Sequence, residues 1–384
     1  MRELKMKKKL FAFLVTAVML FRATVFFCYA ETPADIPFVS AKSALLMDFD
    51  SGKVLCEVNA HTRMGMASTT KIMTALTVVR LTDTSLTVTV PKEAVGIEGS
   101  SVYLCEGEKL TVEQLLYALL LSSANDAATA LAIFCSGSVD AFCAQMNAYA
   151  EALGLKDTHF VNPHGLYNEG HYTTAHELAL ISREALKNDL LRKIFSTYKM
   201  PLPFCGEPNE RLAVNHNKLL RSYDGALGIK TGFTKSTGRC LVSAAEREGL
   251  TLICVTLNAP DDWRDHTALL NYGFENYERR VVADVGEYEY LFPATGAQSG
   301  FVTLYNTAPL AFTVRKGEGQ TELLVESHSP FVYTPVKKGA VCATLTARCG
   351  GETVSSPLTA KEDTLRTEHK KGFWQKLTDI FKKD

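Results

Sequence analysis

The sequence lacks the patterns that mark several common protein classes. Its 384 residues carry a net charge of −1, so no excess of positive charge points to a nucleic-acid partner. It has no Cys-x-x-Cys pair, which removes support for a zinc ribbon, and no glycine-rich phosphate loop. Leu180 stands where a His-Glu-x-x-His zinc peptidase starting at His176 would need its second histidine. We therefore expect neither a metal nor a cofactor. Three further histidines are interpreted as loop or surface residues: His164, His171 and His216.

The remaining composition is that of a soluble globular protein, with 46% hydrophobic and 22% charged residues. The length allows two domains. Ten cysteines are scattered along the chain, and removal of Cys28 with an export segment would leave nine, an odd number. We interpret them as buried thiols, because several stand in apolar runs: Cys135, Cys143, Cys240 and Cys254. A local pair between Cys342 and Cys349 is left open.

The N-terminus has the layout of a secretory signal. Basic residues precede the apolar run 10–21, and the small residue Ala30 offers a cleavage site. Arg22 lies inside the apolar region, where a charge is costly. We expect export, with residues 1–30 removed. The alternative is an uncleaved anchor, because residues 10–30 are long enough to span a bilayer.

Residues 31–278 show the pattern of one α/β (α+β) domain. Strand pairs are expected at 43–50 and 53–58 near the start, and at 225–234, 239–247 and 250–258 near the end. Helical periodicity occupies the middle, from Thr69 and over 111–123, 125–134, 141–154 and 173–188, and it returns at 263–278. The economical architecture is an antiparallel sheet built from both ends of this region, with helices packed on it.

The last hundred residues change character. Short β-rich runs separated by turn residues predict a small all-β domain over residues 279–360. Residues 361–384 form a tail in which apolar and basic side chains alternate at helical spacing, and its apolar face consists of Phe373, Trp374, Leu377, Ile380 and Phe381. Such a helix suits an anionic membrane surface. A tail helix docked on its own protein is the alternative.

Three short motifs carry the chemistry, and they occur in a fixed order. Ser68-Thr69-Thr70-Lys71 opens a helix, Ser123-Ala124-Asn125 lies between two helices, and Lys230-Thr231-Gly232 lies on a strand. Each motif alone is weak evidence; a second Ser-x-x-Lys at Ser196 precedes Met200-Pro201 and is interpreted as structural. All three in this order, each in the right kind of element, match the pattern of penicillin-binding proteins and related β-lactamases.

Each motif has a physical reason. A serine hydroxyl needs a base, and Lys71 lies one helical turn after Ser68 on the same face. A lysine accepts a proton only when neutral, and burial beside a second cation, Lys230, would lower its pKa. Ser123 is expected to relay a proton to the leaving group, and Asn125 to orient Lys71 and the substrate amide. Asp126 is interpreted as a helix N-cap.

The third motif is expected to bind substrate. Lys230 and Thr231 supply donors for a substrate carboxylate. Gly232 has no side chain, so substrate can lie along the strand edge. The backbone N–H groups of Ser68 and Phe233 would form the oxyanion hole.

From about residue 37 to the tail, the chain resembles the serine-type D-alanyl-D-alanine carboxypeptidases, the low-molecular-mass penicillin-binding proteins of the peptidase S11-like family. The likeness rests on LMDFDSGKVLCEVNAHTRMGMASTTKIMTAL, SSANDAATALA, NPHGLYNEGHYTTAHELALISR, NHNKLL and GALGIKTGFTKSTGRCLVSAA. It implies removal of the terminal D-alanine from the peptidoglycan stem pentapeptide through an acyl-enzyme on Ser68. It also implies inhibition by β-lactams, no metal, a C-terminal β domain and a membrane-binding tail at the outer face of the cytoplasmic membrane. Arg264 would line the site. Ala124 and Phe233 depart from the glycine and histidine that occur at these positions in other members.

Three alternatives stay open. A class A-type β-lactamase would need a glutamate soon after Ser-x-Asn, and residues 155–168 contain none. A D,D-endopeptidase of the same family would use the same motifs on cross-linked peptides. A catalytically silent wall-binding protein is the alternative from another class.

Overall fold

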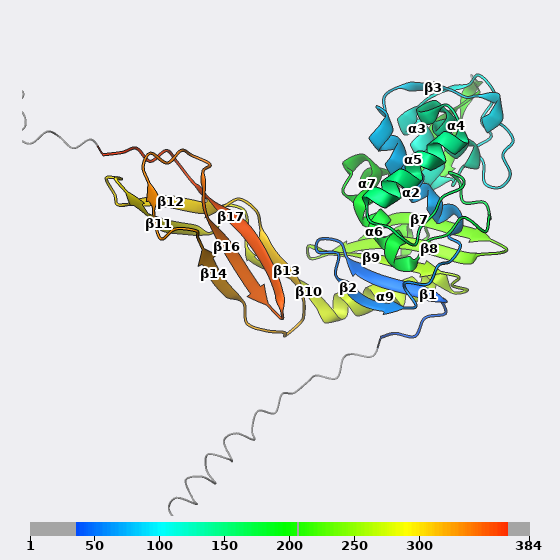
Figure 1. Ribbon diagram of the computed structural model, residues 1–384. Helices are drawn as coiled ribbons and strands as arrows, with labels where there is room; N and C mark the ends of the chain where they lie inside the picture. Colours follow the sequence, from blue (N-terminus) through cyan, green and yellow to red (C-terminus); the bar gives the residue numbers. More distant parts are fainter. Residues whose placement is uncertain (1–35, 206, 368–384) are drawn as a thin grey trace, which may run out of the picture. The chain divides into compact units, whose positions relative to one another are not determined.

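The computed structural model describes residues 36–367 apart from residue 206, and Figure 1 shows their elements. The predicted export segment, with its cleavage site, lies outside the described residues, and so does the predicted tail from residue 368 onward. Over the described part, helices and antiparallel sheets are combined as the sequence predicts, so the α+β interpretation is confirmed.

The main sheet joins both ends of its region of the chain. Its five antiparallel strands follow the order β2-β1-β9-β8-β7. β1 pairs with β9 from Ser43 opposite Leu257 to Asp48 opposite Leu252. β7 is an edge strand, which leaves one side of its backbone free of strand partners. The strands are β1 (Ser43–Asp48), β2 (Val54–Val58), β7 (Ala226–Thr234), β8 (Gly238–Arg247) and β9 (Leu250–Leu257).

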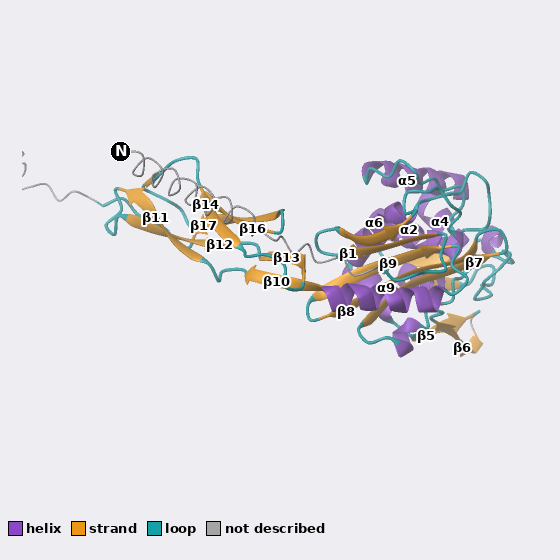
Figure 2. Ribbon diagram, turned by 90° about the horizontal axis from the view of Figure 1, so that it is seen from below, coloured by secondary structure: helices purple, strands orange, loops and turns teal. Residues whose placement is uncertain are grey.

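Helices cover both faces of this sheet, as Figures 1 and 2 show for α6 and α9. Alternate side chains of β1 point to different layers: Leu45 and Met47 join the core with α2 and α6, while Leu46 lies close to Gly273 of α9. β9 is buried along its whole length because both of its faces are covered. The helices are α2 (Lys71–Leu81), α3 (Val112–Leu121), α4 (Asn125–Ser136), α5 (Val139–Ala152), α6 (Ala175–Leu186), α7 (Asp189–Ser196), α8 (Leu219–Ser222) and α9 (Asp262–Asn276), with 3-10 turns at Ala67–Thr70 and Lys92–Ala94.

Among the described residues, no single helix has the length and hydropathy to cross a membrane; α4 and α5 reach both only when taken together across an 83° bend.

Several elements were not predicted from the sequence. The hairpin of β5 (Lys199–Phe204) and β6 (Glu207–Val214) follows α7, and β3 (Thr87–Thr89) pairs with β4 (Lys109–Thr111). Proline is tolerated in β5 because that strand has a single partner in the sheet. Ser196 ends α7, and its hydroxyl donates to the carbonyl oxygens of Arg192 and Lys193, which fits the structural interpretation of the second Ser-x-x-Lys.

The C-terminal strands form their own sheet in the order β14-β16-β17-β12-β11-β15, beside the pair β10-β13. The helix expected up to residue 278 ends at Asn276, and β10 begins at once. Inward side chains such as Val302, Leu304, Leu345 and Leu358 fill the core of these strands. The bounds are β10 (Tyr277–Ala283), β11 (Glu289–Thr295), β12 (Phe301–Asn306), β13 (Leu310–Arg315), β14 (Glu322–Glu326), β15 (Val332–Tyr333), β16 (Val341–Cys349) and β17 (Glu352–Ala360).

The cysteine interpretation was wrong for one pair. Cys105 and Cys205 form a disulfide with a sequence separation of 100, because the unpredicted β5–β6 hairpin carries Cys205 to the loop that contains Cys105. The local alternative, Cys342 with Cys349, was also wrong. Both lie on β16, where seven residues of extended chain span roughly 23 Å, so their sulfur atoms cannot meet. The other described cysteines are free thiols.

Candidate active site

The nucleophile candidate lies in a strained turn that leads into α2. Ser68 belongs to the 3-10 turn Ala67–Thr70, and Ala67 immediately before it has a φ of +48°, a conformation that L-residues avoid. Lys71 follows as the first residue of α2. Its Nζ lies 3.0 Å from Ser68 Oγ, so the spacing read from the sequence brings hydroxyl and amine into hydrogen-bond contact.

Lys71 is fully buried and is held by three oxygen atoms. Besides Ser68 Oγ, its Nζ contacts Asn125 Oδ1 at 2.7 Å and the backbone oxygen of His164 at 2.6 Å. Burial lowers the pKa of Lys71 well below its usual value, and the charge of Lys230 lowers it further, against an opposing effect of Asp126. The amine is therefore set toward its neutral form, as a general base requires.

The second motif is fixed by the loop over residues 95–108, which lies between the 3-10 turn Lys92–Ala94 and β4. Asn125 Nδ2 donates to the carbonyl oxygen of Glu98 at 2.5 Å, and its backbone N–H donates to Ser100 O at 2.7 Å. This fixes the side-chain amide, so that its oxygen faces Lys71. Ser123 is buried with a φ of +58°, and its hydroxyl makes no hydrogen bond within residues 36–367 other than 206. That hydroxyl is free to engage a substrate.

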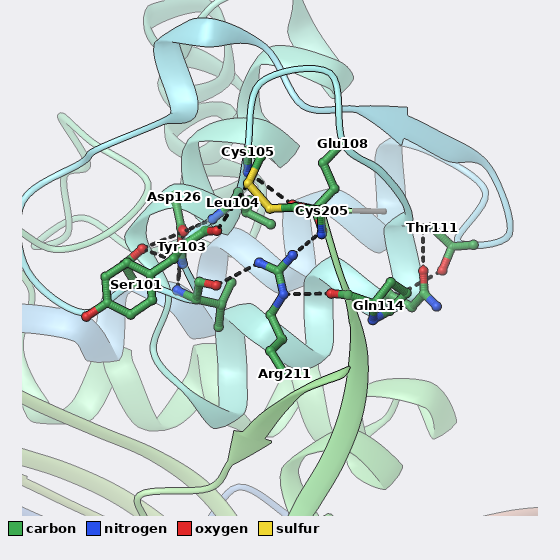
Figure 3. A network of polar contacts seen from close by, with 12 residues as sticks. Ser101, Tyr103, Leu104, Cys105, Glu108, Thr111, Gln114, Asp126, Cys205 and Arg211 are labelled. Carbon is green, nitrogen blue, oxygen red and sulfur yellow. Dashed lines mark hydrogen bonds and ion pairs between the residues drawn. A yellow bond between two sulfur atoms is a disulfide. The ribbon is translucent and has the colours of Figure 1, made fainter. Parts of the chain in front are cut away.

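Figure 3 shows what holds this loop. The Asp126 carboxylate accepts hydrogen bonds from Ser101 Oγ at 2.6 Å and from the backbone N–H groups of Val102 and Leu104 at 3.2 and 3.0 Å. The N-cap interpretation of Asp126 is corrected: Ala124 is the N-cap, and Asp126 lies inside the first turn of α4. Its carboxylate accepts from the N–H of Ala127 next to it and otherwise binds the loop.

The far end of the same loop is tied to the β5–β6 hairpin. Cys105 is bonded to Cys205, and both backbone N–H groups donate to the carboxylate of Glu108, at 3.0 Å each. Glu108 is buried and pairs with Arg211, which also donates to Val102 O at 2.7 Å. The framework around Asn125 thus depends on residues more than 70 positions further along the chain.

The third motif lies along the free edge of β7. Lys230 is buried; its Nζ donates to Thr231 O at 2.9 Å, and burial lowers its pKa to about 7. Gly232 runs past the nucleophile turn so closely that a Cβ there would lie 3.0 Å from Ser68 N. Phe233 is 63% exposed. The edge of β7 and the nucleophile turn therefore lie side by side as two walls of one cleft.

Between these walls lies a cleft of about 370 Å³. It is lined by five predicted site residues, Ser68, Ser123, Thr231, Gly232 and Phe233. Lys71, Asn125 and Lys230 are not at its surface, because they are buried behind the hydroxyl groups. The cleft also includes residues that the sequence did not suggest, namely Ser100, His216, Lys218, Arg239, Asp262 and Trp263.

Arg264 is not among the residues that line this cleft. It is exposed on α9, while the residues of α9 that line the cleft are Asp262 and Trp263. The arginine that lines it is Arg239 on β8, which pairs with Phe233 across the β7–β8 hairpin. The sequence predicted strands over 225–234 and 239–247, and pairing them residue by residue across their turn would have placed Arg239 opposite Phe233. Arg239 Nη2 donates to Asp262 Oδ1 at 2.8 Å, an ion pair that orients the guanidinium.

The histidines were interpreted only partly correctly. His216 is exposed and at the cleft, and His164 contributes its backbone oxygen to Lys71. His171, expected in a loop or at the surface, is buried and contacts Thr70 Oγ1. No sequence signal marked this contact, because it joins residues 101 positions apart.

Comparison with known proteins gives one family. Residues 30–261 match Peptidase_S11, D-alanyl-D-alanine carboxypeptidase. The curated D-alanyl-D-alanine carboxypeptidase DacF of Bacillus subtilis is 33% identical over 335 residues, which cover 84% of this chain and 85% of that protein. The D-alanyl-D-alanine carboxypeptidase DacC of Escherichia coli is 33% identical over 384 residues, with 94% and 92% covered.

Two solved structures to which the chain is similar are a penicillin-binding protein and a DD-transpeptidase. Penicillin binding protein 5 from Haemophilus influenzae is similar with a TM-score of 0.70 at 27% identity, covering 86% of this chain and 99% of that one. The Streptomyces K15 DD-transpeptidase is similar with a TM-score of 0.60 at 35% identity, covering 63% of this chain and 99% of its own.

Proposed function

Because the chain belongs to the Peptidase_S11 family of D-alanyl-D-alanine carboxypeptidases, we propose that it removes the terminal D-alanine from peptidoglycan stem pentapeptides through an acyl-enzyme on Ser68. One observation carries the serine mechanism. Ser68 Oγ lies 3.0 Å from a fully buried lysine amine, and the other two contacts of that amine are carbonyl oxygens.

A neutral amine can keep all three contacts, with Ser68 as the donor in one of them. An –NH₂ group has two hydrogens and one lone pair. The oxygen atoms of Asn125 and His164 can only accept, so they take the two hydrogens. The lone pair is left for the hydroxyl hydrogen of Ser68. In this state Lys71 is ready to receive a proton when Ser68 attacks.

The reaction then runs in two halves. Ser68 Oγ attacks the carbonyl carbon of the penultimate D-alanine while its proton passes to Lys71, and the backbone N–H groups of Ser68 and Phe233 stabilise the oxyanion. The C–N bond breaks as a proton returns, through Ser123, to the nitrogen of the departing D-alanine. Water then hydrolyses the acyl ester and restores the serine.

The substrate ends in a carboxylate, and the cleft offers cationic and hydroxyl donors for it. We assign direct contact with this carboxylate to Thr231 and Arg239, which line the cleft, and not to Arg264. Lys230 is buried behind them with its Nζ donating to Thr231 O, so it would act on the carboxylate through its charge. Gly232 allows the peptide to lie along β7. A β-lactam presents a strained amide and a carboxylate in the same arrangement, so it should acylate Ser68 by the same attack.

The two enzyme alternatives differ from this proposal in substrate and not in the first chemical step. A D,D-endopeptidase would use the same residues on a cross-linked peptide. A β-lactamase would need a base for rapid deacylation, and residues 155–168 supply no glutamate. A silent wall-binding protein would have no need of a buried lysine, Lys71, in contact with a serine, Ser68, that lines the cleft.

We also propose the organisation expected from the sequence: a signal segment over 1–30, a catalytic domain over 31–278, a β-rich domain over 279–360 and a membrane-binding tail over 361–384. The protein would then act outside the cytoplasm, at the outer face of the cytoplasmic membrane. Deleting residues 368–384 should release it from anionic vesicles without loss of activity. Retention on vesicles would argue against the tail as the anchor.

The decisive experiment uses residues 31–384 and a stem pentapeptide ending in D-Ala-D-Ala, with free D-alanine as the readout. The variants Ser68→Ala and Ser196→Ala test the two Ser-x-x-Lys serines against each other. Release by the wild type and Ser196→Ala, but not by Ser68→Ala, is expected. Penicillin labelling at Ser68 without release would favour the endopeptidase. Neither labelling nor release would leave the silent wall-binding protein.

A further inference from the structure

The loop 161–171 lies directly against the nucleophile turn. A Cβ at Gly165 would be 1.9 Å from the carbonyl oxygen of Ala67, so the two backbones are in close contact. The loop gives two backbone carbonyls to α2: His164 O to Lys71 Nζ at 2.6 Å, and Pro163 O to Thr74 Oγ1 at 2.6 Å. The loop therefore frames the turn from outside the Ser-x-x-Lys segment.

At its far end the loop makes a side-chain contact with the same turn. His171 Nε2 lies 2.7 Å from Thr70 Oγ1, and both residues are buried. The backbone N–H of Val161 donates to His171 Nδ1 at 3.1 Å, so Nδ1 must carry a lone pair. The ring hydrogen is then on Nε2, which donates to Thr70 Oγ1.

Thr70 continues the series of hydrogen bonds in the same donor-to-acceptor direction. Its hydroxyl accepts from His171 and donates to Ala67 O at 2.7 Å. A chain of hydrogen bonds of one polarity thus runs from Val161 through His171 and Thr70 to the carbonyl of Ala67. It ends on the residue whose left-handed conformation sets the position of Ser68.

That conformation needs support from its surroundings, because Cβ and carbonyl oxygen approach each other at positive φ in an L-residue. If Ala67 returned to a negative φ, Ser68 would rotate away from Lys71. The backbone N–H of Ser68 would then move away from Gly232 of β7, which it now approaches closely. Burial, aided by the charges of His159 and Lys71, lowers the pKa of His171 to about 4, so the imidazole is neutral near pH 7.

We propose that His171 is a positioning residue for the nucleophile: through Thr70 it holds the carbonyl of Ala67 and so keeps Ser68 in contact with Lys71. This role rests on the proposed serine mechanism. It requires a donor at the Nε2 position, and it does not require His171 to touch substrate or to change its protonation state.

The test uses residues 31–384 and a fluorescent penicillin, with the maximal acylation rate constant and the apparent dissociation constant measured separately. His171→Ala should lower the rate constant about tenfold to hundredfold, since a misplacement of about 1 Å has that effect, and leave the dissociation constant nearly unchanged. His171→Gln keeps a donor at the end of the side chain and should recover most of the rate. The matched control is His159→Ala, an exposed histidine that contacts Gly170 O in the same loop.

Thr70→Val removes the relay hydroxyl with little change in shape and tests the same idea if His171→Ala does not fold. Its rate should fall as in His171→Ala, and the double variant should be no slower than the slower single variant. A normal rate in folded Thr70→Val, multiplying effects in the double variant, or failure of His171→Gln to recover any rate would each overturn the proposal. Labelling of the wild type, and its absence in Ser68→Ala, tests the serine mechanism itself.

Discussion

The Cys105–Cys205 disulfide should contribute a large share of the stability of the protein. It closes a loop with a sequence separation of 100. In the chain-entropy account, a link that closes a loop of about 100 residues lowers the conformational entropy of the unfolded chain and so raises its free energy by about 4.7 kcal/mol at 25 °C. Native proteins have a total stability of about 5–15 kcal/mol, so the loss of this link would remove from about a third to nearly all of it.

The double variant Cys105→Ser with Cys205→Ser isolates the covalent link. The backbone N–H groups of both residues bind Glu108, and the pair of Glu108 with Arg211 does not use sulfur, so the network should persist in the variant. We therefore expect a loss of about 4–5 kcal/mol in the free energy of unfolding, and a melting temperature lower by roughly 10–20 °C.

Urea unfolding followed by circular dichroism measures the loss, since all described helices lie before residue 277. Cys342→Ser with Cys349→Ser is the matched control, because both are free thiols, and it should change the free energy by far less. Penicillin acylation of the still-folded variant should proceed at nearly the wild-type rate, because the contacts of Asn125 are made by the backbone of the loop. A loss below about 1 kcal/mol would refute the chain-entropy reasoning for this bond.

Three further predictions concern the cleft. Burial is the main cause of the lowered pKa of Lys71, and Lys230→Gln removes the second cause, the charge of Lys230, so the pKa of Lys71 should rise. Since the neutral amine is active above its pKa and is lost as the pH falls through it, the acid limb of the pH profile of acylation should move to higher pH, and an unmoved limb would exclude this coupling. Gly232→Ala would place a Cβ 3.0–3.1 Å from backbone atoms of the nucleophile turn, so acylation should slow about tenfold or more at an unchanged melting temperature; normal kinetics would show that the two walls are less close than described. Arg239→Gln should lower kcat/KM for the pentapeptide about tenfold, whereas Arg264→Gln should leave it unchanged, and the reverse order would restore the assignment made from the sequence.

Much of the fold was predictable because its signals are local. The β1–β2 hairpin, α3 with its capping box at Thr111 and Gln114, and the three strands from Ala226 to Leu257 follow from patterns within about ten residues. The β5–β6 hairpin was missed because its first strand contains two prolines, Pro201 and Pro203, which the pattern treats as breaks.

The sequence by itself determined the family and the contact between Ser68 and Lys71, the pair to which we assign the reaction. Ser68 and Lys71 are three residues apart at the start of a helix, so the geometry of one turn brings their side chains together in any fold that keeps the helix. The tertiary structure alone decided what surrounds that pair. The contacts of Lys71 with Asn125 and with His164 span 54 and 93 positions, and the disulfide spans 100. Contacts at such separations depend on how helices, loops and strands pack, and this packing is what buries the lysine, lowers its pKa and brings Arg239 to the cleft in place of Arg264.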